Sequence, residues 1–170
     1  LPREPLDEHA TSFRALNDRA LQALGMQTGM SHMEWFLRPD GSPVISEVAA
    51  RPPGVNIMMM MGDAHGVDAW EKWTRLMVHN TFEIPERRWA CGSAFLRGSG
   101  HGRLVASVEG LDAVLADMGD SLVRAAVPKV GQPRSSHYEG EGFVVVRAET
   151  TAAVVSLLKN VITSTRITYR

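Results

Sequence analysis

The stretch of sequence that decides the fold reads GMSHMEWFLRPDGSPVISEVAARPPG and covers residues 29–54. Its two halves, 30–38 and 43–51, mix apolar residues, several of them aromatic or β-branched, with polar ones, a composition typical of half-buried strands. Between them, residues 39–42 read Pro-Asp-Gly-Ser, four residue types that favour turns. The stretch therefore predicts an antiparallel β-hairpin.

Two glutamates of this hairpin are expected to face each other. If residues 39–42 form the whole loop, Arg38 pairs with Pro43. Counting inward from that pair places Glu34 opposite Glu47. Opposed side chains on neighbouring strands have Cβ atoms about 5 Å apart, where like charges are destabilising. The arrangement therefore indicates either a carboxyl group that keeps its proton or a divalent cation bound by both carboxylates.

A cationic side chain accompanies the two glutamates. Arg51 lies on the same face of its strand as Glu47, and its planar guanidinium group suits a phosphate or a carboxylate. A purely structural interpretation competes with this one, because hairpins often carry glutamates on a solvent-exposed face. In that case Glu47 simply pairs with Arg51, or Glu34 with His32. The pattern alone leaves both interpretations open.

The same residues resemble the metal-binding hairpin of the ATP-grasp superfamily. The resemblance rests on residues 29–36, on Asp40-Gly41 in the turn, and on SEVAARPPG at 46–54. Members of that superfamily bind magnesium-ATP between two α+β subdomains and phosphorylate a carboxylate to an acyl phosphate. An amine or another nucleophile then displaces the phosphate. The resemblance thus implies a carboxylate–amine or related ligase, with ATP and Mg (or Mn) as cofactors and a small carboxylate as substrate.

The resemblance also implies a role for individual residues. Glu34 and Glu47 correspond to the metal ligands, and Arg51 to the catalytic arginine that steadies the substrate or its acyl phosphate. Gly54 corresponds to the glycine of the following loop, whose backbone N–H groups would bind an anion of the cofactor at a helix start. Ala49 departs from the pattern, because many members have Asn there as a third ligand and Ala cannot coordinate a metal.

The other elements follow from the spacing of apolar residues. Helices are expected over 9–24, around 58–61, over 67–80, over 111–118 and from an N-cap at Thr150 or Thr151 to 161; strands are expected over 89–97, 104–108, 122–127, 142–148 and 166–169. The fold class is α+β: the C-terminal portion of an ATP-grasp fold, with its antiparallel metal hairpin flanked by helices, plus a small module built on a mixed sheet. A seam at 81–88 divides the C-terminal part of the ATP-grasp domain (1–84) from a small α+β C-terminal domain (85–170).

Several ATP-grasp segments are not visible in the sequence. In that superfamily an N-terminal domain, a glycine-rich flap, two phosphate-binding lysines and an adenine-hinge segment precede the hairpin. With Leu rather than Met at position 1, we expect the C-terminal part of a longer cytoplasmic ligase, inactive by itself. A second hypothesis is a non-catalytic binding module whose carboxylates are surface charges and whose small sheet mediates homodimerisation.

Composition limits the expected partners and the role of the single cysteine. The 170 residues include 18 Lys plus Arg and 19 Asp plus Glu, a net charge of −1, so neither a nucleic acid nor a membrane surface is an expected partner. The single cysteine, Cys91, excludes an internal disulfide and reads as a small buried residue in a reducing compartment. Two segments have no assigned role: 98–102, expected as a glycine-rich hairpin loop, and 131–142, expected as a polar loop that reaches a substrate or is mobile.

Overall fold

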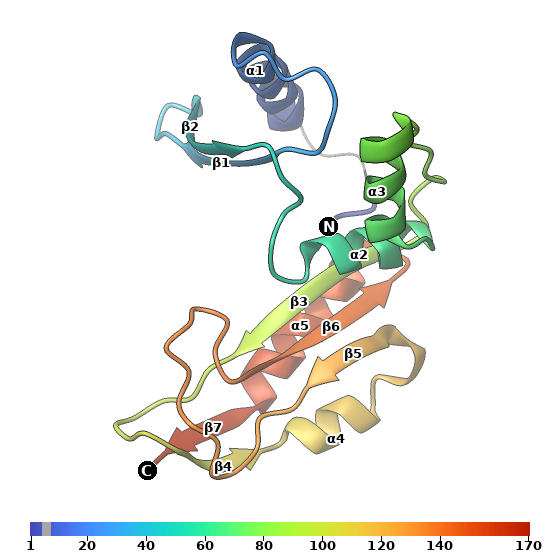
Figure 1. Ribbon diagram of the computed structural model, residues 1–170. Helices are drawn as coiled ribbons and strands as arrows, with labels where there is room; N and C mark the ends of the chain where they lie inside the picture. Colours follow the sequence, from blue (N-terminus) through green and yellow to red (C-terminus); the bar gives the residue numbers. More distant parts are fainter. Residues whose placement is uncertain (5–7) are drawn as a thin grey trace. The chain divides into compact units, whose positions relative to one another are not determined.

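The structure, a computed structural model, describes residues 1–4 and 8–170, and it contains two compact units (Figure 1). Unit 1 comprises 1–4, 63–65 and 87–170, and unit 2 comprises 5–62 and 66–86. The main division along the chain thus falls after residue 86, inside the seam at 81–88. The assignment of 1–84 and 85–170 to two functional domains stays a prediction.

Unit 2 contains the hairpin and the helices around it. Its elements are α1 (Glu8–Ala23), β1 (His32–Leu37), β2 (Pro43–Ala49), the first part of α2 (Ile57–His65) and α3 (Ala69–His79). α1 ends at Ala23, and Gly25 follows with a φ of +72° that suits a residue without a Cβ. α3 begins at Asp68, whose carboxylate accepts two backbone N–H groups, and ends at Asn80 in the left-handed conformation. These helices lie within a few residues of their predicted positions.

The hairpin forms, but its register corrects the counting that predicted it. Leu37, rather than Arg38, is the Cα partner of Pro43. A β-bulge between Glu34 and Trp35 in the register then shifts the pairing by one residue, and Glu34 is the partner of Glu47 after all. The predicted pair is therefore present because two deviations from regular pairing cancel each other.

Unit 1 contains two small sheets, two α-helices and a 3-10 turn. Its elements are β3 (Ala90–Leu96), β4 (Val105–Glu109), α4 (Leu111–Ala116), a 3-10 turn (Gly119–Ser121), β5 (Leu122–Ala126), β6 (Gly142–Ala148), α5 (Thr151–Ser164) and β7 (Arg166–Tyr169). The strands form a sheet in the order β3-β6-β5 and a second sheet of β4 and β7. All of these strand pairs are antiparallel, so the expectation of a mixed sheet is wrong.

The core of unit 1 lies between the three-stranded sheet and α5, which packs against β3 and β6 (Figure 1). Val144, Val146 and Val161 are completely buried there. Gly92 on β3 permits this packing, because a Cβ at that position would lie 2.6 Å from Cδ1 of Leu158. Cys91 is buried and free, as expected, and burial raises the pKa of its thiol to about 11. No helix in the described residues is long and apolar enough to span a membrane.

Candidate functional site

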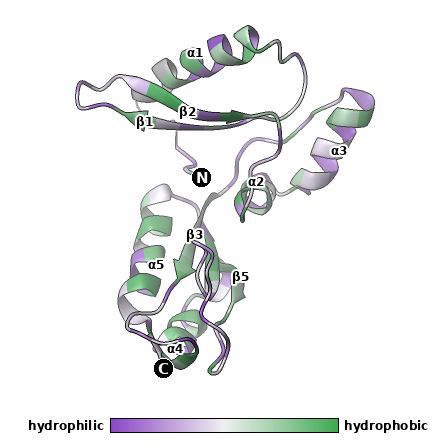
Figure 2. Cartoon of the chain, turned by 60° about the vertical axis from the view of Figure 1, so that its left-hand side comes forward, coloured by the Kyte–Doolittle hydropathy of each residue, from purple (hydrophilic) through white to green (hydrophobic). Residues whose placement is uncertain are grey.

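The candidate site lies on the β1–β2 hairpin of unit 2. Glu34 and Glu47 are partners across the two strands, and both side chains are exposed. A hydrophilic stretch interrupts the otherwise hydrophobic β2 in Figure 2. Because α1 packs on the hairpin, with the ring of Phe13 against Trp35, the hairpin has a supporting layer. The fold thus presents two opposed carboxylates to solvent on a supported scaffold.

Arg51 belongs to the same cluster. Its guanidinium nitrogen Nη2 lies 3.8 Å from Oε1 of Glu47, and the two side chains are 50% and 54% exposed. Nη1 of Arg51 also donates a hydrogen bond to the carbonyl oxygen of Pro52, at 3.1 Å. The structure therefore brings Arg51 to Glu47, while half of the Arg51 side-chain surface stays open to solvent.

Gly54 lies between the hairpin and α2. It is exposed, a Cβ there would meet no atom within 4 Å, and its carbonyl accepts the N–H of Ile57 at 3.3 Å. Val55 follows in the left-handed conformation with φ +56°. The connection is thus a tight turn directly before a helix, but no bond or contact joins Gly54 to the two glutamates.

Two carboxylates alone give an incomplete shell for a cation. Among the residues that the structure describes, no group of three or more His, Cys, Asp or Glu side chains could hold a metal ion. Ala49, which departs from the Asn ligand of many ATP-grasp members, has no side-chain donor atom, and its partner across the strands is His32. Nδ1 of His32 is buried without a hydrogen bond, but an imidazole is a poor ligand for magnesium.

The donor set nevertheless fits one kind of metal site. Magnesium is commonly held by one or two carboxylates, with nucleotide phosphates and water completing its shell. Glu34 and Glu47 supply oxygen donors of that kind from two adjacent strands. The hairpin therefore fits magnesium bound together with phosphates better than a metal held by protein alone. His32 lies opposite Ala49, as the count that pairs Glu34 with Glu47 also implies.

Comparison with solved structures places this arrangement in a known fold. The L-amino acid ligase from Bacillus licheniformis matches with a TM-score of 0.78 at 18% identity, over 99% of this chain and 43% of that one. Phosphoribosylglycinamide synthetase from Anaerococcus prevotii matches with a TM-score of 0.74 at 13% identity, over 100% and 44%. N5-carboxyaminoimidazole ribonucleotide synthetase from Thermotoga maritima matches with a TM-score of 0.68 at 17% identity, over 97% of this chain and 44% of that one.

This chain has part of the ATP-grasp fold. It spans less than half the length of each of these three solved proteins. No protein-family model matches the sequence, and no curated protein matches it either. The prediction of an ATP-grasp fold is therefore confirmed by the three-dimensional structure.

Proposed function

We propose that the chain is the C-terminal part of an ATP-dependent carboxylate–amine ligase and contributes that enzyme's magnesium-binding hairpin. The observation that carries the proposal is the pairing of Glu34 with Glu47, two exposed carboxylates held opposite each other on an ATP-grasp scaffold. Such a pair destabilises a hairpin unless a cation or a proton offsets it. The fold match to several ligases disfavours the alternative of a non-catalytic dimerisation module.

The residues of this chain would act through position and charge. Glu34 and Glu47 would hold the cation at the hairpin, and Arg51 would place its guanidinium group beside a transferring phosphate. When bound, magnesium-ATP supplies the phosphoryl group and neutralises charge on the phosphate oxygens. Arg51 has to leave Glu47 or share it to do so, and the 3.8 Å separation of two half-exposed side chains makes that exchange inexpensive.

The proposed reaction is the one that the resemblance to ATP-grasp ligases implies. A carboxylate oxygen of the substrate attacks the terminal phosphorus of ATP, and ADP leaves. An amine then attacks the acyl carbon, inorganic phosphate leaves with the electron pair of the broken bond, and the amine loses a proton. Arg51 would stabilise negative charge in both steps. Gly54, in the turn before α2, would offer a backbone N–H to an anion of the nucleotide.

The metal site can be tested on the chain by paramagnetic broadening. Mn²⁺ added with ATP is expected to broaden amide signals of β1 and β2 near Glu34 and Glu47, and Glu34→Gln or Glu47→Gln should remove the effect. Glu71→Gln is a matched control, since Glu71 also pairs with an arginine four residues on, at 3.8 Å and with similar exposure. Broadening that is absent, or that persists in both hairpin variants, would contradict the proposal.

Catalysis provides a second test. The chain alone is expected to show negligible ATP hydrolysis or ligation, so robust turnover by the purified chain would contradict its being a part of the catalytic unit. In a longer protein that contains the chain, Glu34→Gln and Glu47→Gln are expected to lower turnover by orders of magnitude while the fold stays intact. Near-normal turnover in either variant would remove the metal assignment.

A further inference from the structure

The two loops without an assigned role lie together in unit 1. The segment 98–102 is not a hairpin loop as expected, because it runs from β3 in one sheet to β4 in the other. The second loop, 127–141, joins β5 to β6. Leu104 forms an isolated antiparallel bridge with Pro133, and the N–H of Arg134 donates to the carbonyl of Arg103 at 2.8 Å. The loops are thus paired backbone to backbone.

A buried carboxylate holds the loops in place from behind. Glu141 is 8% exposed and accepts the N–H of Ser135 at 3.0 Å and the N–H of Gly98 at 3.3 Å. The hydroxyl group of Tyr169 also bonds to it. Burial alone would raise the pKa of Glu141, but these hydrogen bonds outweigh burial and lower it. The carboxylate of Glu141 therefore accepts hydrogen bonds from backbone amides of both segments and links the two loops.

The pairing makes Arg103 and Arg134 neighbours along the two paired backbones. The guanidinium carbon of Arg134 lies 4.5 Å from the centre of the Tyr169 ring, and its Nη1 donates to the carbonyl of Gly100 at 3.3 Å. The side chain of Arg103 is exposed and has no hydrogen bond or ion pair within the described residues.

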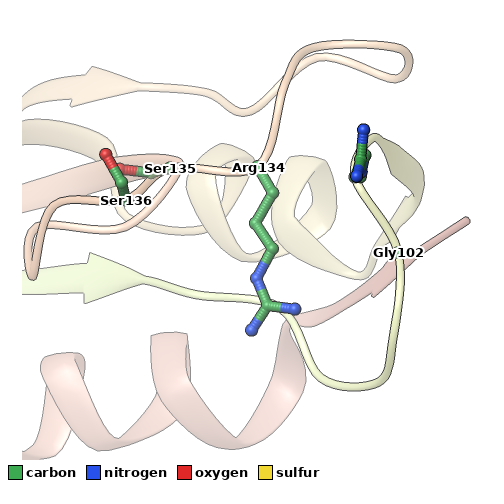
Figure 3. A pocket seen from close by; sticks show the side chains of 5 residues that line it. Gly102, Arg134, Ser135 and Ser136 are labelled. Atoms are coloured by element: carbon green, nitrogen blue, oxygen red, sulfur yellow. The ribbon is translucent and has the colours of Figure 1, made fainter.

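A groove of about 450 Å³ opens at this point, and we call it the arginine groove; it is lined by Gly102, Arg103, Arg134, Ser135 and Ser136. Figure 3 shows the two serines on one side, Gly102 on the other, and Arg134 between them. The lining contains two cations, two hydroxyl groups and no carboxylate. Gly102 is required here, since a Cβ would lie 2.6 Å from the backbone of Arg170.

The hydroxyl groups of the two serines differ in their hydrogen bonding. Oγ of Ser135 accepts the N–H of His137 at 3.1 Å and donates to its carbonyl at 3.4 Å, so that hydroxyl shapes the loop. Ser136 is exposed, and its hydroxyl has no partner within the part of the chain that the structure describes. Arg103 and Ser136 are thus the groups with free donors, and Arg134 adds a fixed charge.

We propose that the arginine groove of unit 1 binds a phosphate group. Two guanidinium groups and a free hydroxyl match a doubly charged, three-oxygen acceptor better than a singly charged carboxylate. The inference does not rest on the proposed ligase function, because every residue that carries it belongs to unit 1 and none belongs to the hairpin. It assigns a role to two loops that the hairpin chemistry leaves unused.

The test is an NMR titration of the 170-residue chain with inorganic phosphate at about pH 8, where phosphate is a dianion. Ionic strength is held constant with chloride. We expect saturable shifts of the amides of Gly102, Arg103 and Ser136. Arg103→Ala should weaken the affinity about tenfold, and Arg103→Lys should restore part of it, since lysine keeps the charge without the planar fork.

Lys159→Ala is the matched control, because Lys159 is an exposed cation on α5 whose side chain has no partner in the described residues. This variant is expected to bind phosphate as the unchanged chain does. Ser136→Asp should abolish binding by adding a negative charge to the groove. The proposal is overturned if phosphate causes no saturable shift, if Lys159→Ala weakens binding as much as Arg103→Ala, or if acetate binds as tightly as phosphate.

Discussion

Replacing Glu34 by Gln is expected to stabilise the hairpin, although Glu34 belongs to the proposed metal site. The side chain faces Glu47 across the strands, so the substitution removes a like-charge contact and keeps the size and shape of the side chain. Residues that evolve for function often reduce stability in this way. The same substitution at the partner residue, Glu47→Gln, removes this repulsion but also removes the ion pair with Arg51.

The structure gives the order of magnitude of the two effects. Opposed like charges on neighbouring strands cost about 0.2–1 kcal/mol, and a half-exposed ion pair contributes about 0.2–1 kcal/mol. Glu34→Gln should therefore raise the free energy of opening the hairpin by about 0.2–1 kcal/mol. Glu47→Gln should change that free energy less, since the two contributions oppose each other. Salt should reduce the difference between the variants, because both effects are screened.

Hydrogen exchange of the β1 and β2 backbone amides measures this free energy directly, since local opening exposes them. The comparison needs both variants at low and high salt, without divalent cations. If Glu34→Gln lowers the protection of these amides at low salt or leaves it unchanged, the repulsion between the carboxylates is not the dominant interaction. The reasoning that leads from the register to a cation site would then fail.

Three further predictions concern unit 1. Gly110→Ala should destabilise it by about 1–3 kcal/mol in urea unfolding, because Gly110 has φ +78° and a Cβ there would lie 2.0 Å from the carbonyl oxygen of Ser164. Asp63→Asn should cost about 1–3 kcal/mol by the same measurement, because it removes the negative charge that lies 2.8 Å from the half-buried Arg124. The pKa of Glu141 is lowered in the folded protein, so the stabilisation that its charge provides is complete above the ordinary glutamate pKa. This stabilisation is lost as pH falls through the folded-state pKa. Hydrogen-exchange protection of the amides bonded to Glu141 should therefore decrease in acid and not in alkali.

The local elements of the fold could be predicted because local patterns determine them. The β6 and β7 bounds match the predicted strands, and α5 begins after Thr150, whose side chain accepts the N–H of Ala153 as a helix cap does. Turn residues likewise indicated the hairpin, and Asp40 accepts the N–H of Ser42 within it. Periodicity and capping act over a few residues, so the sequence displays them directly.

Pairing between distant segments was less predictable. The mixed sheet was a wrong expectation, because which strands become neighbours depends on the packing of the whole unit and not on the composition of each strand. The register of the hairpin shows the same limit at shorter range. The Glu34–Glu47 pair was predicted from a regular ladder, whereas the structure reaches it through Leu37–Pro43 and a bulge.

By itself, the sequence determined the hairpin, the two opposed glutamates on it and the resemblance to the ATP-grasp fold, since each depends on residues 29–54 read in order. Only the tertiary structure decided that Arg51 lies beside Glu47, one of the pairings that the sequence left open, and that two unassigned loops meet at Arg103 and Arg134. The physical reason is distance along the chain. Side-chain patterns record local conformation, whereas contacts between remote segments follow from how the whole chain buries its apolar surface.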